Sequence, residues 1–326
     1  MLALRAALAM RVGPGQPNDQ GEPSREEPDA EGEVRRHAPT QWHRACQHGP
    51  VERDVEVNGV RLHCVVEGEG PLVLLLHGFP ETSRAWRKQM PALTKRFRVV
   101  APDLRGFGAS DKPKGIAAYR TSVVAEDVVA LIHAFGAERA HVVGHDWGGG
   151  VAWTLATLHP EAVDRLVALN CPHPAVMQRA LRSNWTQIRK SWYIFAFQLP
   201  WLPEWSFRRN GAKALKDGLR SSSKPGTFSE ADLDEYARAF SAPGAATGAI
   251  NYYRAAVRSR VPTQKIAAPT LLIWGYDDFA LGIELTRGMD GLFESPPRIE
   301  YVPDTSHWVM EERPEVVNRL LLEFLA

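Results

Sequence analysis

The sequence lacks three features that would place it in other classes of protein. Its only cysteines are Cys46, Cys64 and Cys171, whose wide spacing and odd number argue against a disulfide framework or a zinc site. Its 39 lysines and arginines balance 38 aspartates and glutamates, and no basic stripe indicates nucleic-acid binding. No stretch approaches the roughly twenty apolar residues of a membrane span. We therefore expect a cytoplasmic protein with reduced thiols and no integral membrane segment.

Large apolar residues are also scarce near the N-terminus. The first eleven residues weakly resemble a targeting segment, but Arg5 interrupts the apolar run and no clear cleavage site follows. From Val12 to Pro50 the chain is rich in Gly, Pro, Glu, Arg and Gln, so it has little apolar surface to bury. We predict a disordered tail over residues 1–50 and leave a targeting role open.

Strands alternate with helices from Val51 onwards. Apolar runs and alternating patterns predict strands at 54–57, 60–66, 72–76, 97–101, 141–143, 163–169, 270–275 and 298–302. Asn58-Gly59 predicts a type I′ hairpin turn between the first two. Helical spacing predicts helices from 82 or 83 to about 90, at 121–135, at 151–158 and at 314–325. This alternation is typical of an α/β protein with a mostly parallel, doubly wound sheet.

The strand pattern disappears between His173 and about Pro262. This stretch is helical and rich in Trp, Tyr and Phe. In such sheets ligands bind at the carboxyl ends of the strands, where an inserted segment can cover them. We therefore predict a helical cap, or lid, at 173–262, inserted into a core made of 51–172 and 263–326.

The most informative stretch is AHVVGHDWGGG, residues 140–150. A short β-branched run leads through glycines into a helix, as in the G-x-S-x-G nucleophile elbow of α/β-hydrolases, but Asp146 replaces the serine. A carboxylate with a pKa near about 4 is ionised without a base, which suits displacement at a saturated carbon. Hydrolysis of the resulting ester is chemistry that the elbow scaffold performs. The alternative is a glycine-rich turn with a capping aspartate.

Two further residues complete a triad in the chain order of this scaffold, which is nucleophile, acid, histidine. Asp278 follows the strand predicted at 270–275, and His307 follows the one at 298–302. Both positions would bring the side chains to Asp146. Taken singly, Asp277 or Asp278 could cap a helix, and a loop histidine is usually solvated; the conjunction favours a triad.

The loop at 77–80 follows a buried strand in the position that supplies an oxyanion-hole amide. We expect the backbone N–H groups of Phe79 and Trp147 to form that hole. His77, Phe79, Pro80 and Trp147 are the expected substrate contacts. The peptide bond before Pro80 is a candidate for the cis form.

These motifs together resemble the soluble type of α/β-hydrolase-fold epoxide hydrolases. The resemblance rests on HGFPE at 77–81, DLRGFGASD at 103–111, GHDWGG at 144–149 and DTSHW at 304–308, and it extends from about residue 51 to the C-terminus. It implies two lid tyrosines, matched by Tyr193 in WYIFAFQLP and Tyr253 in NYYR. The family usually has Trp where this chain has Tyr252.

The resemblance implies an activity and its partners. An opening epoxide releases an alkoxide, and two phenols can hydrogen-bond that oxygen and protonate it. Lid aromatics are, however, more often packing residues. We expect a small hydrophobic epoxide and water as substrates, with no cofactor, no metal and no nucleic acid; a homodimer is left open.

Two other functions remain open at this stage. A hydrolytic dehalogenase resembles this family in its Asp, His, acid and Trp after the nucleophile. Haloalkane dehalogenases usually carry a halide-binding group such as Asn near the position of Phe79, and fluoroacetate dehalogenases carry arginines after the nucleophile; this chain has neither. A ligand receptor without turnover is the third possibility.

Overall fold

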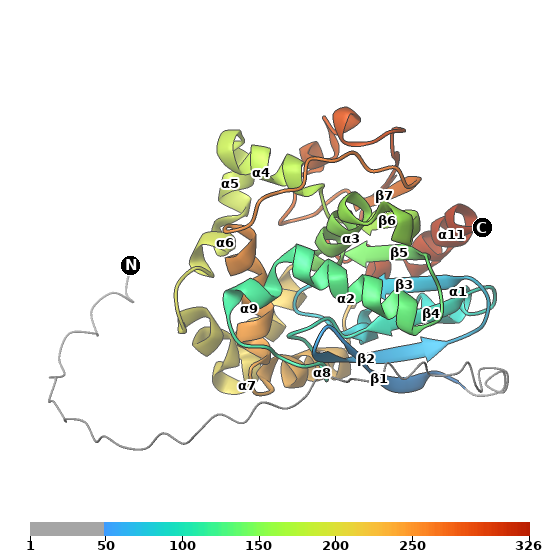
Figure 1. Ribbon diagram of the computed structural model, residues 1–326. Coiled ribbons are helices and arrows are strands. Elements are labelled where there is room, and N and C mark those ends of the chain that lie inside the picture. The colour runs from blue at the N-terminus through green and yellow to red at the C-terminus, as the bar shows by residue number, and fades with distance from the viewer. Residues whose placement is uncertain (1–48) are drawn as a thin grey trace, which may run out of the picture. The chain divides into compact units, whose positions relative to one another are not determined.

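The computed structural model describes residues 49–326. All but the last two residues of the predicted tail over 1–50, and the targeting-like segment with them, therefore lie outside the described residues. The described part contains a sheet of eight strands in the order β1-β2-β4-β3-β5-β6-β7-β8 (Figure 1). These are β1 Val51–Val57, β2 Val60–Glu67, β3 Leu72–Leu76, β4 Arg98–Pro102, β5 Ala140–His145, β6 Val163–Leu169, β7 Thr270–Gly275 and β8 Arg298–Val302.

The sheet combines an antiparallel edge with a parallel body. Strand β2 pairs antiparallel with both β1 and β4, whereas β4, β3, β5, β6, β7 and β8 pair parallel to one another. The hairpin turn has φ angles of 48° at Asn58 and 69° at Gly59, the left-handed pair that a type I′ turn requires. The predicted hairpin and the mostly parallel sheet are confirmed.

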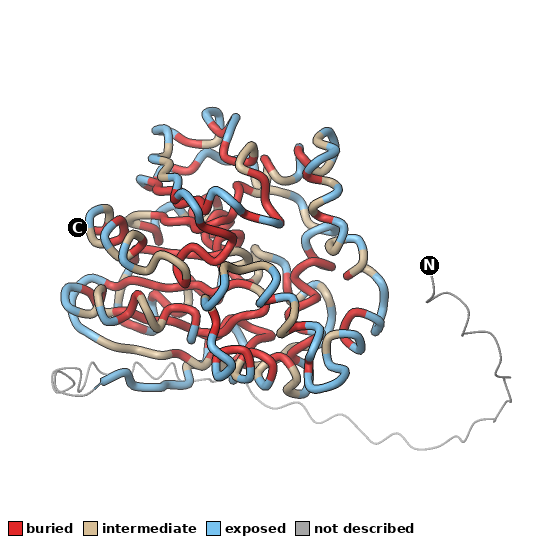
Figure 2. The backbone as a smooth tube through the Cα atoms, turned by 180° about the vertical axis from the view of Figure 1, so that it is seen from behind, coloured by how far each residue is buried: buried red, intermediate tan, exposed pale blue. Residues whose placement is uncertain are grey.

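Helices cover both faces of the sheet because the central strands are buried on both sides. In β3, Leu72, Leu74 and Leu76 face one apolar core, whereas Val73 and Leu75 face the other, as strand geometry dictates. The first core is covered by α2 (Thr121–Ala134) and α3 (Trp147–Leu158). The second is covered by α1 (Met90–Leu93), α10 (Val309–Glu312) and α11 (Pro314–Leu325). Figure 2 shows the buried residues concentrated along the strands between these layers.

The region after β3 differs from the prediction. Instead of one helix from 82 or 83 to about 90, the chain forms a 3-10 turn at Ser83–Trp86 and then the short helix α1. Pro91 lies in the first turn of α1, where its missing N–H is tolerated, so the proline marks the start of a new helix. Strand β4 also begins one residue later than predicted, since the Phe97 N–H closes a turn onto the Leu93 carbonyl. Further 3-10 turns lie at Ile116–Tyr119, Pro160–Ala162, Ile283–Thr286 and Asp290–Leu292.

A run of six helices connects β6 to β7, and we call residues 174–256 the helical segment. They are α4 Pro174–Ser183, α5 Trp185–Lys190, α6 Trp192–Ala196, α7 Leu202–Ser221, α8 Glu230–Ser241 and α9 Ala245–Ala256. Ion pairs join the segment to the strand-end loops: Arg84 to Asp232 at 2.9 Å, and Lys224 to both Asp277 and Asp304 at 2.8 Å. Within residues 49–326, none of the helices combines the length and apolar character that crossing a membrane would require.

Candidate active site

Asp146 stands at the turn between β5 and α3. Its backbone has φ 47° and ψ −117°, a conformation that costs energy in a non-glycine residue and is typical of functional sites. The turn is tight enough that a Cβ on Gly148 would overlap the Leu76 carbonyl oxygen, so only glycine fits there. The Phe79 N–H donates a hydrogen bond of 2.8 Å to Asp146 Oδ1. The elbow therefore presents a fixed carboxylate at the carboxyl end of the sheet.

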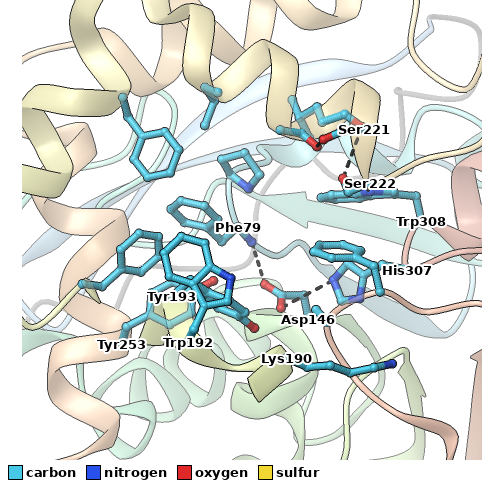
Figure 3. A pocket seen from close by; sticks show the side chains of 18 of the residues that line it. Phe79, Asp146, Lys190, Trp192, Tyr193, Ser221, Ser222, Tyr253, His307 and Trp308 are labelled. Atoms are coloured by element: carbon cyan, nitrogen blue, oxygen red, sulfur yellow. Dashed lines mark hydrogen bonds and ion pairs between the residues drawn. The ribbon is translucent and has the colours of Figure 1, made fainter. Parts of the chain in front are cut away.

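His307 and Asp278 lie beside that carboxylate, as the order of the motifs predicts. His307 Nδ1 is 2.7 Å from Asp278 Oδ2, and His307 Nε2 is 3.6 Å from Asp146 Oδ2. Figure 3 shows His307 on one side of Asp146, with Phe79 above it. The imidazole thus bridges two carboxylates, one from the elbow and one from the loop after β7.

The sequence analysis missed Asn170, which holds Asp278 in place. Its Nδ2 donates to Asp278 Oδ2 at 2.8 Å, and its Oδ1 accepts from the Gly275 N–H at 3.0 Å. The backbone N–H groups of Ala280 and Leu281 donate to Asp278 Oδ1 at 2.8 and 2.9 Å. The available signal was a polar residue directly after the apolar strand β6.

A second buried pair that the sequence analysis did not assign lies behind the elbow. Glu81 Oε2 is 2.9 Å from His145 Nδ1 and accepts from the Gly78 N–H at 3.2 Å. His145 Nε2 is 3.0 Å from the backbone oxygen of His307. The pair therefore ties together the elbow, the Phe79 loop and the His307 loop. Both residues stand inside the motifs HGFPE and GHDWGG, which is the signal that could have found them.

The charges of the site shift the pKa values of its members. Burial alone would lower the pKa of His307, but the charges of Asp278 and Asp146 and their hydrogen bonds outweigh it and raise that pKa to about 10. Burial alone would raise the pKa values of the two carboxyls, yet His307 brings both below their ordinary values. The Phe79 N–H adds to the effect on Asp146. At neutral pH the site therefore holds two carboxylates around one imidazolium.

In the loop after β3, Phe79 and Pro80 lie where the sequence analysis predicts, but His77 does not. The Phe79-Pro80 peptide bond is cis, and both side chains line a cavity that reaches Asp146. The Trp147 N–H is the first of α3 and so belongs to the N–H groups that a helix leaves without intrahelical partners. His77 differs from its predicted role as a substrate contact. Its ring is fully buried, lines neither cavity described below, and accepts a hydrogen bond from the Leu104 N–H at 3.0 Å.

Tyr193, from α6, and Tyr253, from α9, face the elbow from the helical segment. Their ring centroids are 5.8 Å apart, and the rings of Phe197 and Trp147 pack around them. Among the described residues, neither hydroxyl makes a hydrogen bond of standard geometry, although the Trp147 side chain interacts with the Tyr253 hydroxyl and opposes part of the rise in its pKa. Burial, and then the charge of Asp146, raise the pKa of each phenol well above its ordinary value, so both stay protonated.

Tyr252 provides an internal comparison with Tyr253. Its ring is fully buried, and its hydroxyl donates to the Arg105 carbonyl oxygen at 3.0 Å. It lines neither cavity. The structure therefore directs the second tyrosine of NYYR, not the first, toward Asp146.

Two cavities meet at Asp146, Tyr193 and Tyr253. The larger, of about 770 Å³, also reaches His307 and runs between the core and helices α5, α6 and α7 (Figure 3). The smaller, of about 340 Å³, also contacts Trp147 and extends toward α4 and the end of α9. Their linings are mostly apolar side chains. A hydrophobic molecule could therefore place a reacting atom between the carboxylate and the two phenols.

Comparison with known proteins identifies the family. The family described as alpha/beta hydrolase fold matches residues 71–314. The chain belongs to this family. It is 40% identical over 276 residues to the AB hydrolase superfamily protein YfhM of Bacillus subtilis, covering 83% of this chain and 96% of that protein. It is 36% identical over 280 residues to human Epoxide hydrolase 4, covering 83% and 77%.

A solved structure extends the likeness to three dimensions. The Bacillus megaterium epoxide hydrolase in complex with an inhibitor superposes with a TM-score of 0.75 at 31% identity, covering 84% of this chain and 99% of that one. The predicted fold class and the resemblance to the epoxide hydrolase family are confirmed.

Proposed function

We propose that the protein is an epoxide hydrolase that converts a hydrophobic epoxide to a vicinal diol. One observation carries the proposal: an ionised aspartate stands in the elbow opposite two phenols whose hydroxyls make no hydrogen bond of standard geometry among the described residues. Both tyrosines line the two cavities, so their hydroxyls are placed to donate to an oxygen that the substrate brings. An epoxide oxygen fits, because it becomes an alkoxide as the ring opens and needs a proton.

In the first step Asp146 attacks an epoxide carbon. We assign the attack to Oδ2, because the Phe79 N–H holds Oδ1. A bond forms between Oδ2 and carbon, the ring C–O bond breaks, and a proton from Tyr193 or Tyr253 neutralises the released oxygen. The product is an alkyl ester of Asp146 with Oδ1 as its carbonyl oxygen.

In the second step water hydrolyses that ester. Esterification removes the negative charge of Asp146, which lowers the pKa of His307 from its high value in the free enzyme and makes its neutral, basic form accessible. His307, oriented by Asp278, then takes a proton from water, and the resulting hydroxide attacks the ester carbonyl carbon. The bond between that carbon and Oδ2 breaks, the leaving alkoxide takes the proton of the new carboxylic acid, and the proton on His307 returns to the tyrosinate formed in the first step. The N–H groups of Phe79 and Trp147 stabilise the oxyanion on Oδ1 until the diol leaves.

In this proposal residues 173–262 serve as a cap over a core formed by 51–172 and 263–326. The cap supplies the two phenols, and the core supplies the nucleophile and the base. The proposed substrate contacts are Phe79, Pro80 and Trp147. The cytoplasmic location and the homodimer stay predictions.

A hydrolytic dehalogenase is the second candidate, and one observation favours it. The indole N–H of Trp147 is buried without a hydrogen-bond partner of standard geometry among the described residues, and such a donor can bind a halide. Phe79, however, offers no second side-chain donor. The hydroxyls of Tyr193 and Tyr253 would also have no function, because a departing halide needs no proton.

Incubation with a panel of styrene-oxide-type epoxides beside a panel of haloalkanes separates these functions. Diol formation supports the epoxide hydrolase, halide release the dehalogenase, and binding without turnover a receptor. A single turnover in ¹⁸O-labelled water then tests the covalent step. We expect the label in Asp146 and not in the first diol formed; label in that diol would exclude the ester.

A further inference from the structure

An exposed aromatic surface lies beside the larger cavity. More than half of the exposed large apolar side chains in residues 49–326 come from the short stretch between residues 185 and 205. Trp185, Trp192 and Trp201 are 71%, 67% and 70% exposed, and Phe195 and Trp205 are also more than half exposed. We call these five residues the tryptophan surface. They lie in α5 and α6, at the residue before α7 and in the first turn of α7, and these helices follow one another along one side of the helical segment (Figure 1).

Packing does not account for this surface. Single exposed apolar residues are common, but a cluster of large ones marks a site of interaction with a partner or a membrane. Trp201 also has a φ of 50°, the left-handed conformation that bulky residues rarely adopt. Its side chain does not offset that cost by burial, since it is among the most exposed apolar residues of the described chain.

The charge around the tryptophan surface is strongly one-sided. Residues 174–213 contain seven lysines and arginines and one acid, Glu204, although the whole chain is balanced at 39 to 38. Glu204 is buried and pairs with Arg254 at 2.6 Å, so it does not offset the exposed cations. Lys213 pairs with Asp217 on the same helix, so the excess positive charge comes from the other six. Arg209 lies over the ring of Trp205 at 4.3 Å, which places a cation directly on the aromatic surface.

The surface is continuous with the route to Asp146. Trp185, Arg189, Lys190 and Trp192 line the larger cavity, which Asp146 also lines. Figure 3 shows Trp192 close to Tyr193 at this cavity. A hydrophobic molecule at the tryptophan surface is therefore already at the entrance of the cavity.

We propose that the tryptophan surface docks on the headgroup region of an anionic phospholipid bilayer. Indole rings are enriched at membrane interfaces, because one part of the ring is apolar and the N–H is polar. Lysines and arginines beside them are attracted to anionic headgroups, each strengthening binding about fivefold. Such peripheral docking needs no membrane-spanning helix. Entry of a lipid-dissolved substrate from this surface is a corollary that rests on the proposed epoxide hydrolase function; the docking does not.

A second copy of the chain fits this surface less well. In a two-fold dimer the same patch would face itself, so the excess of cations on one protomer would meet the same excess on the other. Like charges brought together oppose association, whereas an anionic bilayer complements them. The one-sided charge therefore favours the membrane.

Vesicle sedimentation of the full chain tests the docking. The probes are vesicles of phosphatidylcholine mixed with phosphatidylglycerol, and vesicles of phosphatidylcholine alone. The variants are Trp201→Ser/Trp205→Ser and Arg208→Glu/Arg209→Glu, whose residues line neither cavity. Tyr276→Ser is the matched control, because Tyr276 is 57% exposed but follows β7, outside the helical segment. Unfolding midpoints show that each variant is folded.

We expect the parent to bind the anionic vesicles, with a blue shift of tryptophan emission, and to bind less at high salt because screening weakens the attraction. Each double variant should weaken this binding by about tenfold or more. Tyr276→Ser should bind like the parent. If one double variant fails to fold, the other still decides the outcome.

Three results would overturn the docking. One is a parent protein that does not bind the anionic vesicles. Another is double variants that bind like the parent, since binding would then come from another part of the chain. The third is a parent that dimerises without binding vesicles and whose dimer the double variants dissociate, which would identify a second copy as the partner. Because vesicle binding is measured without substrate, a failure of the proposed epoxide hydrolase function would appear separately, in the turnover panel.

Discussion

The two sides of the candidate site are held in place by different forces. On the core side, Asp278 accepts four hydrogen bonds, from His307, Asn170 and the N–H groups of Ala280 and Leu281. On the side of the helical segment, the hydroxyls of Tyr193 and Tyr253 make no hydrogen bond of standard geometry with the described residues. Contacts between aromatic rings hold these two side chains in place.

This difference matches the chemistry proposed for each side. The core side carries charge before any substrate arrives, and a buried charge must be fixed and hydrogen-bonded to be tolerated. The phenols are neutral and meet charge only as the epoxide opens. Ring packing positions them, while their hydroxyls remain available to the substrate oxygen. Loss of the nucleophile or the base on the core side should therefore stop one step of the reaction. Loss of a phenol hydroxyl should only slow the opening of the epoxide ring.

Removal of the nucleophile should have the largest effect. Asp146→Asn keeps the shape of the side chain and an acceptor for the Phe79 N–H but lacks the attacking carboxylate. We expect alkylation to fall by about ten-thousandfold or more. Single-turnover kinetics with intact-protein mass spectrometry measures the ester. A variant that still forms diol at the parent rate would exclude Asp146 as the nucleophile, provided that peptide mapping shows the amide has not hydrolysed back.

Replacement of the base should separate the two steps. In His307→Gln the attack by Asp146 should persist, whereas ester hydrolysis should slow by about a thousandfold. The ester should therefore accumulate, and mass spectrometry should find the adduct on the peptide that contains Asp146. Asp146→Asn is the matched negative control for that adduct. Turnover at the parent rate without an adduct would mean that His307 is not the base.

Removal of the phenol hydroxyls probes the other side of the site. Tyr193→Phe and Tyr253→Phe each keep the ring packing and lose only the donor. We expect each to slow alkylation by about ten- to a thousandfold, equivalent to about 1.4–4 kcal/mol in the transition state. The double variant should be much slower, because one phenol can partly replace the other.

Tyr252→Phe is the control that the chain itself provides. It should leave alkylation near the parent rate but lower stability by about 1 kcal/mol, because it loses the hydrogen bond to the Arg105 carbonyl. Near-parent alkylation in the Tyr193/Tyr253 double variant would reject the acid role. A large loss in Tyr252→Phe alone would move that role to Tyr252.

Sequence patterns predicted the core side of the molecule better than the helical segment. The bounds of β3, β6, β7, β8 and α11 agree with the predictions, because uniform apolar runs or a regular amphipathic pattern end at Gly, Pro or polar residues. The region at 82–93 failed because the prediction continued a helix toward Pro91. The helices of the segment could not be bounded individually, since exposed tryptophans obscure the apolar stripe that marks a buried helix face.

The same contrast holds for the individual residues of the site. Motif order identified Asp146, Asp278 and His307 as neighbours, because each follows a strand that ends at the same edge of the sheet. Asn170 and the buried position of His77 depend on contacts between distant loops, which a local pattern does not encode. The choice between Tyr252 and Tyr253 likewise depends on which face of α9 meets Arg105.

The last prediction concerns how the rates of the two steps depend on pH. The rate of ester hydrolysis should change by up to about tenfold per pH unit, whereas the rate of alkylation should not. In the free enzyme two carboxylates raise the pKa of His307 to about 10, so its imidazole is protonated at neutral pH. The lowered pKa of Asp146 and the raised pKa values of the phenols keep all three in their reactive forms between about pH 6 and pH 9. Alkylation should therefore be nearly flat across this range.

Ester hydrolysis should instead rise with pH, because it requires neutral His307, and level off above the pKa that His307 has in the ester. That pKa lies below the free-enzyme value, since the charge of Asp146 is gone. Stopped-flow single turnovers resolve the two rates, and His307→Gln should flatten the hydrolysis profile while Tyr193→Phe leaves its shape unchanged. Alkylation that falls as pH rises toward 10, where His307 of the free enzyme loses its proton, would instead mean that protonated His307 assists ring opening, so the roles assigned to the core and the phenols would be wrong.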